Sequence, residues 1–254
     1  MQIRLNKFLA DLGIASRRKA DQLIDEGKVM LNQKKAKLGD KVDPEKDQVM
    51  FEGKKLTSDD RENFEYWLLN KPRNVVSTVS DETGRKTVFD YVKSKAKARV
   101  YPVGRLDLES EGLLLMTNDG ELANRLTHPK YEVRKVYKVT VNGIFSEGKV
   151  ERLLRGVRLA EGKTSFDTLE LLEKEGRDFT LKIGIHQGVK REIRRVCAKV
   201  GWEVTKLLRV KIGNLSMTGL IVGNVRKLTE EEVIDLKKLV GLYENPTSSQ
   251  NSNL

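Results

Sequence analysis

The chain has 254 residues, enough for one medium-sized domain and a smaller one, each with its own hydrophobic core. Its 48 Lys and Arg residues outnumber its 37 Asp and Glu residues, and the resulting net charge of +11 favours a polyanionic partner. A single cysteine excludes an internal disulfide, and with two histidines it is too little for a four-ligand Cys/His zinc site.

The positive charge is concentrated in two segments. Residues 1–37 contain nine basic and four acidic residues, and residues 177–211 contain ten and three. These segments make up less than a third of the chain but carry more than its whole net charge. A soluble, lysine-rich surface would also make a protein basic, but clustering of this kind is typical of nucleic-acid binding.

Two short helices are predicted at the N-terminus. Apolar residues follow a helical period that ends at Gly13, and Ser16 is a suitable N-cap for a second helix, Arg17–Glu26. Short alternating segments then predict strands at Val29–Asn32 and Val49–Phe51.

The first turn of the second helix carries three cations, although the helix dipole favours acids there. A phosphate would meet free backbone amides and these charges together, and a solvated basic face is the alternative. The sequence GIASRRKADQLIDEGKVMLN resembles the S-four-type RNA-binding domain, named after a small-subunit ribosomal protein, over about residues 2–55. The predicted RNA-binding residues of this module, residues 1–60, are Arg17, Arg18, Lys19, Lys34 and Lys35.

A polar segment without periodicity, Thr57–Glu62, is the predicted linker to a second domain. Apolar runs then predict strands at Tyr66–Leu69 and Val75–Val79, followed by a basic turn that contains Arg85 and Lys86.

Asp107 lies in the connection Gly104-Arg105-Leu106-Asp107, just before the apolar run Leu113–Met116, which predicts a buried strand. A free carboxylate is ionised at neutral pH, and the neighbouring Arg105 favours the charged form. From these residues alone, Asp107 is a nucleophile, a base, a metal ligand or an ordinary turn-closing residue.

Alternation between Val133 and Val141 predicts a strand that places Tyr137 on a defined face, where a tyrosine is most often ordinary packing. Further elements are predicted as a helix from Glu147 to Arg155, strands at Thr168–Leu172 and Phe179–Ile185, a helix around Ile193–Val200, a strand at Lys206–Ile212 and a capped helix at Glu230–Val240. Cys197 is predicted to be a small apolar core residue.

The string YPVGRLDLESEGLLLMTNDGE around Asp107 resembles, nearly residue for residue, the active-site segment of the ribosomal RNA pseudouridine synthases, in the branch that modifies single uridines. The resemblance covers about residues 2–240. It implies that Asp107 is the essential catalytic residue and that Tyr137, in a Lys-x-Tyr motif, stacks on the target base. It also implies that Arg194 pairs with Asp107.

The cations of the second domain are the other expected RNA contacts. Two positions depart from the family pattern, because Gln187 replaces a usual acid and Leu208 a common lysine. The predicted RNA-binding residues of this domain are Arg85, Lys86, Arg105, Lys190, Arg191, Arg195 and Arg209.

We therefore predict an α+β protein. The small α/β RNA-binding module precedes a catalytic domain, residues 61–242, with a mixed, mainly antiparallel sheet, and a disordered polar tail, residues 243–254, follows. The expected activity is isomerisation of uridine to pseudouridine in ribosomal RNA, with large-subunit rRNA favoured. That reaction has no redox step and no group donor, so neither a cofactor nor a metal is expected.

The expected partner is ribosomal RNA or a pre-ribosomal particle, and the protein is expected to be monomeric. No apolar run approaches the ~18 residues that span a bilayer, and the N-terminus lacks a secretion signal, which predicts a cytoplasmic protein.

Four alternatives share part of these features. The chain could instead modify small-subunit rRNA, or bind rRNA as a non-catalytic assembly factor with no need of Asp107, Tyr137 and Arg194 together. A metal-dependent nuclease would need clustered carboxylates, for which Glu109 and Glu111 are the only hint. A transfer-RNA pseudouridine synthase would share the chemistry but seldom this N-terminal module.

Overall fold

The structure is a computed structural model that describes residues 2–60 and 62–243. The chain forms two compact units. The first, called the N-terminal unit here, contains Met1–Glu65 with Ala96–Arg99 and Asn118–Gly120, and the second, the C-terminal unit, contains the other described residues. Of the predicted tail, all but its first residue lies outside the described residues.

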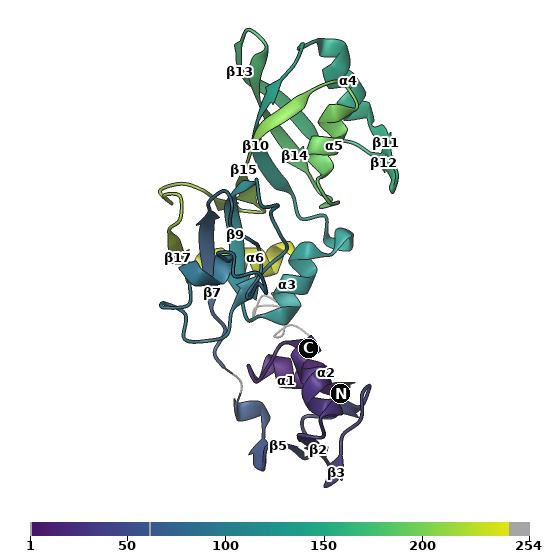
Figure 1. The fold of residues 1–254 in the computed structure, drawn as a ribbon, viewed down its shortest axis with the longest axis vertical. Helices are drawn as coiled ribbons and strands as arrows, with labels where there is room; N and C mark the ends of the chain where they lie inside the picture. Colours follow the sequence, from purple (N-terminus) through teal and green to yellow (C-terminus); the bar gives the residue numbers. More distant parts are fainter. Residues whose placement is uncertain (1, 61, 244–254) are drawn as a thin grey trace, which may run out of the picture. The chain divides into compact units, whose positions relative to one another are not determined.

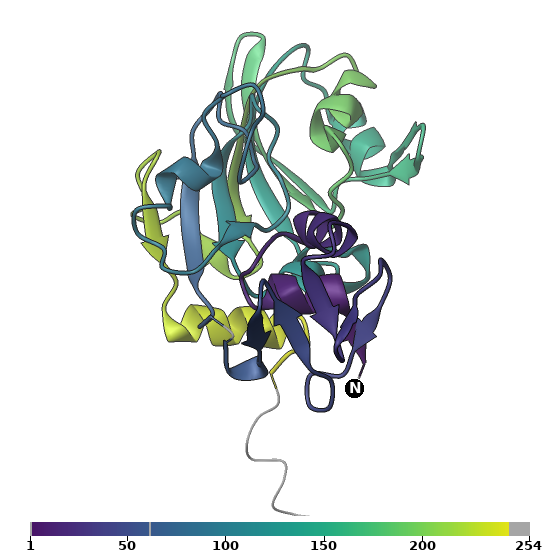
Figure 2. The same ribbon diagram turned by 60° about the horizontal axis from the view of Figure 1, so that its bottom comes forward.

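The N-terminal unit packs two helices on short strands of its own, as the purple and blue segments of Figures 1 and 2 show. Ser16 caps the second helix, because its Oγ accepts a hydrogen bond of 3.2 Å from the amide of Lys19, as predicted. The elements are β1 (Ile3–Arg4), α1 (Leu5–Asp11), α2 (Arg17–Asp25), β2 (Val29–Leu31), β3 (Lys34–Lys35), β4 (Lys41–Val42), β5 (Val49–Phe51) and β6 (Lys54–Leu56), followed by a 3₁₀ turn at Ser58–Asp60.

Apolar faces of these elements form one core. Leu9 of α1, Ala20 and Ile24 of α2, Val29 of β2 and Val49 of β5 are almost fully buried in it. The strands form an antiparallel sheet in the order β3-β2-β5-β6, and β1 pairs with β4. The predicted helices and the predicted strands at β2 and β5 are confirmed to within one or two residues.

The C-terminal unit is built on one long sheet (Figure 1). Its strand order is β13-β14-β10-β15-β9-β7-β17, with β16 added beside β15 and β8 beside β9. All pairs are antiparallel except β9 with β15, which is parallel, so the predicted mixed, mainly antiparallel sheet is confirmed. The strands are β7 (Tyr66–Lys71), β8 (Tyr101–Pro102), β9 (Glu111–Thr117), β10 (Lys135–Asn142), β11 (Val157–Leu159), β12 (Gly162–Thr164), β13 (Thr168–Glu175), β14 (Asp178–Ile185), β15 (Glu203–Ile212), β16 (Leu215–Ser216) and β17 (Val225–Lys227).

Four helices cover the two halves of this sheet. Helices α4 and α5 lie on the same side of the half formed by β10, β14 and β13 (Figure 1), and α3 and α6 contribute to the core of the β7–β9 half. The parallel pair β9–β15 joins the halves. The helices are α3 (Gly120–Thr127), α4 (Glu147–Arg155), α5 (Glu192–Ala198) and α6 (Glu230–Leu239), with 3₁₀ turns at Val88–Tyr91 and Pro129–Tyr131.

The prediction of a strand at Val75–Val79 is wrong. Only an isolated bridge forms there, between Val76 and Thr87. The segment does not extend a ladder because Thr78 turns back to bond the Val76 carbonyl at 2.9 Å and the Ser77 side chain bonds the backbone of Leu106. Apolar, β-branched residues therefore gave a strand-like pattern to a bent connection.

Among the described residues, no helix is long and apolar enough to cross a membrane.

Candidate active site

The loop that carries Asp107 connects β8 with β9 and is anchored in both cores. Val103 is buried with β7 and β9, whereas Leu106 is buried with Tyr137 in the other half of the sheet. Between them, Gly104 has a φ of +70°, a conformation that glycine adopts without strain. Asp107 comes next and is half-buried, and its carbonyl accepts a bond of 3.0 Å from the Ser110 amide. The aspartate therefore lies where the halves of the sheet meet.

Two side chains from a neighbouring segment fix this loop. The Ser77 hydroxyl accepts a bond of 3.1 Å from the Leu106 amide and donates one of 2.7 Å to the Leu106 carbonyl. Lys71, which is fully buried, donates from Nζ to the carbonyls of Ser110 at 2.7 Å and Pro72 at 3.0 Å. Burial lowers the pKa of Lys71 to about 8, although the charges of nearby carboxylates, Asp107 among them, oppose the shift.

Sequence reasoning missed both residues. The signal available for Lys71 was a lysine at the end of an apolar strand and directly before a proline, a place where a charge needs a partner. Nothing in the sequence points to Ser77 as the partner of Leu106, which lies 29 positions away.

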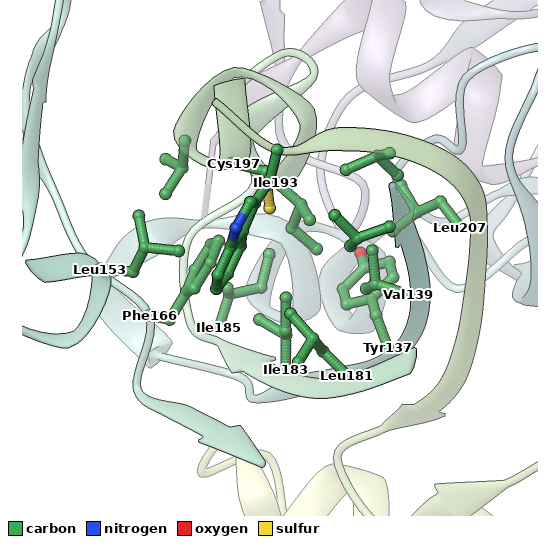
Figure 3. Packing of buried hydrophobic residues seen from close by; sticks show 14 of the residues in the cluster. Tyr137, Val139, Leu153, Phe166, Leu181, Ile183, Ile185, Ile193, Cys197 and Leu207 are labelled. Carbon is green, nitrogen blue, oxygen red and sulfur yellow. The ribbon is translucent and has the colours of Figure 1, made fainter. Parts of the chain in front are cut away.

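Tyr137 lies in the middle of the sheet, on β10, and is 7% exposed. It faces Ile183 on β14 and Arg209 on β15, and the β10–β15 register shifts between Val136 and Tyr137. Such a bulge changes the direction of neighbouring side chains, and bulges are frequent beside active sites. Figure 3 shows the ring within the cluster that includes Val139 and Ile183.

The loop and Tyr137 are linked through one strand. Arg209, opposite Tyr137, is also paired with Gly112 at the start of β9, and its Nε donates a bond of 2.7 Å to the Leu113 carbonyl. Gly112 has a φ of +107°, and a Cβ there would overlap the backbone of Arg209. Only glycine therefore allows β9 to approach β15 this closely, which sets the distance between the Asp107 loop and Tyr137.

Asp107 and Tyr137 line the same cavity, which has a volume of about 250 Å³. Its apolar lining includes Tyr137, Ile185, Ile193 and Leu207. The Tyr137 hydroxyl has no hydrogen bond to another described residue. Its oxygen is not fully buried, so it is accessible. The polar lining includes Asp107 together with the cations Arg105, Lys190 and Arg191. A flat ring fits the apolar part of the lining, and an anionic backbone fits the polar part.

Arg194 does not form the predicted ion pair with Asp107 in the described part of the chain. Its Nη1 donates a bond of 2.7 Å to the Val204 carbonyl, and its Nη2 lies 3.8 Å from the carboxylate of Glu109. Its Nε and Nη2 are buried without a hydrogen-bond partner among the described residues. Burial lowers the pKa of Arg194, and the charges of Glu109 and Asp107 oppose this shift, so Asp107 acts on the guanidinium without touching it.

The other predicted RNA-binding cations fall into different environments. Arg85 is held by Asp81 at 2.6 and 3.1 Å and Arg195 by Glu161 at 2.6 and 2.8 Å, and the Lys86 ammonium lies 4.4 Å from the centre of the Tyr91 ring. Arg209 is only 4% exposed, so it lies in the core and not on the surface of the protein. It is buried because its guanidinium binds the backbone of β9. The predicted RNA-binding cations of the N-terminal unit are all exposed: Arg17, Arg18, Lys19, Lys34 and Lys35.

Two further residues complete the description of α5. Glu192 is buried and accepts a bond of 3.1 Å from the Val189 amide, which fixes the loop before the helix, and burial raises its pKa. Cys197 is fully buried and its pKa is raised to about 12 by burial, so it is the core residue that the sequence predicted.

The carboxylates near Asp107 do not converge on one point. Glu109 faces Arg191 at 3.3 Å and Glu111 faces Lys206 at 3.9 Å. Within the described ranges, no group of three or more His, Cys, Asp or Glu side chains could hold a metal ion. This geometry gives no support to the nuclease alternative.

Comparisons with known proteins agree with this geometry. Residues 65–199, more than half of the chain, match the family model described as RNA pseudouridylate synthase, and residues 3–49 match the S4 domain. The chain belongs to the RNA pseudouridylate synthase family. The family resemblance of the sequence is thereby confirmed, as is its RNA-binding N-terminal module.

Several relatives match over nearly the whole chain. The ribosomal large subunit pseudouridine synthase B of Bacillus subtilis (strain 168) is 45% identical over 93% of this chain and 96% of its own. The dual-specificity RNA pseudouridine synthase RluF of Escherichia coli (strain K12) is 38% identical over 94% of this chain and 79% of its own. A solved pseudouridylate synthase has a TM-score of 0.65 and 29% identity, and covers 92% of this chain and 99% of its own. This chain is therefore an RNA pseudouridine synthase by family, and the match to its relatives includes the N-terminal module.

Proposed function

We propose that this protein converts uridine to pseudouridine in ribosomal RNA, with Asp107 as its essential catalytic residue. The observation that supports this most directly is the cavity that Asp107 and Tyr137 share, although they come from a loop and a strand thirty positions apart. In a chain of this family, these residues provide the groups that the reaction needs: a carboxylate, an aromatic ring beside it, and three cations for the RNA backbone.

The reaction breaks the bond between the ribose and the ring nitrogen N1, turns the base, and joins the ribose to the ring carbon C5. The hydrogen on C5 leaves to water and N1 gains a proton, so no oxidant, reductant or group donor takes part. The Asp107 carboxylate assists departure of the base through the ribose, by attack on the sugar carbon or by removal of a sugar proton. The loop contacts of Ser77 and Lys71 hold it in position.

Tyr137 serves as the platform for the freed base. Its ring belongs to the packed core, so it is rigid, and its accessible hydroxyl can take part in removing the proton from C5. The target uridine must leave its stack, at a cost of a few kcal/mol, and stacking on Tyr137 with cation–phosphate contacts offsets this. Arg105, Lys190 and Arg191 lie where the strand would enter.

We assign to Arg194 an orienting role that is completed when RNA binds. In the free protein its nearest acid partner is Glu109, at 3.8 Å, and two of its nitrogen atoms lack acceptors among the described residues. Catalytic hydrogen bonds are often long in free enzymes and shorten in the complex. A turn of the guanidinium from Glu109 to Asp107 would fix the carboxylate for reaction.

Large-subunit rRNA is the favoured substrate. The Bacillus subtilis relative, named for that subunit, matches 93% of this chain, and the wording of the GRLD segment is closest to the same subgroup. The exposed cations of the N-terminal unit are assigned to rRNA phosphates, on free rRNA or a pre-ribosomal particle. We propose a cytoplasmic monomer that uses neither metal nor cofactor.

The test is tritium release from large-subunit rRNA labelled at C5 of uridine, with Asp107→Asn as the matched control. Wild-type protein should release tritium and the variant, which keeps the shape but not the charge, should not. Sequencing that maps pseudouridine in rRNA from a deletion strain then identifies the uridine. The proposal would be contradicted if the wild-type protein released no tritium from large-subunit or small-subunit rRNA. Release by the variant near the wild-type rate would also contradict it.

A further inference from the structure

A second, smaller cavity lies next to the one that contains Asp107 and Tyr137. It shares Gly104, Arg105 and Gly188 with the larger cavity and has a volume of about 120 Å³. A cavity needs only about 10–15 Å³ of such volume to hold one water molecule, so this space has room for a small group such as one phosphate.

Arg209 provides the first sign that this cavity takes an anion. The residue is 4% exposed, and its guanidinium is fixed by the bond from Nε to the Leu113 carbonyl. Its Nη2 is buried and has no hydrogen-bond partner among the described residues, and Arg209 is one of the residues that line the cavity. A buried, charged donor without an acceptor is unfavourable, so the site is incomplete as it stands.

Lys135 provides a second, independent sign. Its Nζ donates only to backbone carbonyls, those of Val133 at 3.1 Å and His186 at 3.4 Å. Burial, and then the like charge of Arg209, lower the pKa of Lys135 to about 8. The acid whose charge acts on it is Glu192, but that carboxylate accepts the Val189 amide, and no ion pair joins it to Lys135 in the described ranges.

The walls strengthen any charge interaction in this space. They include the apolar side chains of Val103, Leu115 and Leu126, which lower the local dielectric. Lys135 and Arg209 thus line one small cavity together with Arg105, and no acidic residue is among the described residues that line it. A single anion between Lys135 and Arg209 would give the Arg209 guanidinium an acceptor and reduce the repulsion between the two charges.

We propose that the second cavity binds one phosphate group of the RNA strand, held by Lys135 and Arg209, next to the uridine in the larger cavity. This rests on the proposed function. The shared residues Gly104 and Arg105 belong to the same loop as Asp107, so a phosphate bound here would fix the ribose relative to the catalytic carboxylate. The site would then recognise a nucleotide and not a free nucleoside.

The test is equilibrium binding of small ligands to the full-length Asp107→Asn protein, which leaves the ligands intact, by calorimetry. Uridine, uridine 3′-monophosphate, uridine 5′-monophosphate and inorganic phosphate are compared. One of the two monophosphates should bind about ten- to a hundredfold more tightly than uridine, because hydrogen bonds to charged groups have this strength. Lys135→Met, added to this background, should remove the gain.

Lys138→Met is the matched control, since Lys138 is exposed on the same strand and faces Glu173 at 3.7 Å. It should keep the gain. Arg209→Lys is the second test variant, checked by circular dichroism because Arg209 also supports β9, and it should reduce the gain as well. Equal binding of uridine and both monophosphates, or equal losses in the Lys135 and Lys138 variants, would overturn the proposal.

Two further outcomes are separated by this design. Inorganic phosphate that binds as tightly as the better monophosphate, with the same dependence on Lys135, would mean that the site takes free phosphate and would overturn its assignment to the RNA strand. Binding does not depend on turnover, so failure of the proposed function would show as missing tritium release by the wild-type protein, whatever these ligands do.

Discussion

The cations in the first turn of α2 and two cations that bind the backbone around the Asp107 loop, Lys71 and Arg209, lie in opposite environments. Arg17, Arg18 and Lys19 are exposed in the first turn of α2 and form no ion pair among the described residues. Lys71 and Arg209 are 0% and 4% exposed, and Nζ of Lys71 and Nε of Arg209 donate to backbone carbonyls. Exposed cations attract phosphates in a way that salt screens, whereas buried cations hold particular atoms in place. We therefore assign affinity mainly to the N-terminal unit and geometry to the C-terminal unit.

Apart from the loss of Asp107 itself, the largest expected effect concerns the platform in the C-terminal unit. Tyr137→Ala removes the stacking ring and leaves a hole in a packed core, so single-turnover tritium release should fall by about a hundredfold or more. Tyr137→Phe keeps the ring and loses the hydroxyl, so RNA binding should persist while the rate falls. Equal rates for Tyr137→Phe and wild type would leave stacking as the only role of Tyr137.

The next effect concerns the approach of β9 to β15. Gly112→Ala should lower the free energy of unfolding by about 1–3 kcal/mol, because the new methyl group meets the Arg209 backbone and φ is positive. Gly148→Ala in α4 is the control, since nothing lies within 4 Å of its Cβ, and it should be neutral or stabilising. Urea unfolding measures both. Equal stability of the two variants would show that β9 can move away from β15 at no cost.

The third effect tests the exposed half of the comparison. Replacing Arg17, Arg18 and Lys19 with Gln in the full chain should weaken rRNA binding and flatten the slope of log affinity against log salt by about 2 to 3 if all three contact phosphates. A control with the same charge change replaces Lys46, Lys54 and Lys55, which are exposed elsewhere on this unit. If both triple variants change the slope equally, α2 is only a solvated basic face.

The smallest effect is a pH dependence of stability that comes from Lys71. Between pH 8 and 10.5 the unfolded chain holds a proton on Lys71 that the folded protein has lost, because burial lowers the folded-state pKa to about 8. Unfolding then takes up a proton, so this group makes stability rise with pH, by about 1 kcal/mol between pH 8 and 9. Lys71→Met should lack this rise in urea unfolding. The same pH profile in both proteins would show that Lys71 keeps its charge.

Local patterns predicted the local structure well. The helix predicted for Glu147–Arg155 has these bounds, and the Thr229–Glu232 capping box of α6 forms with both of its hydrogen bonds. Both signals depend on residues within one or two turns of the chain, where spacing decides the structure.

The contacts that build the site are not local, and the sequence pattern did not predict them. Ser77 bonds Leu106 and so bends a segment that has the composition of a strand. Arg209 was expected at the RNA surface, but pairing with Gly112 and the bond to Leu113 bury it. A basic residue in a sequence indicates a charge but not its environment, which depends on strands far away in the chain.

One pair of assays on the same rRNA tests the division between affinity and geometry most directly: equilibrium binding, and single-turnover tritium release at saturating protein. Asp107→Asn should bind like wild type and release no tritium. The α2 triple variant should bind more weakly, most clearly at high salt, and release tritium at the wild-type rate once the RNA is saturated. Release by Asp107→Asn near the wild-type rate, or a slow α2 variant at saturation, would contradict this account.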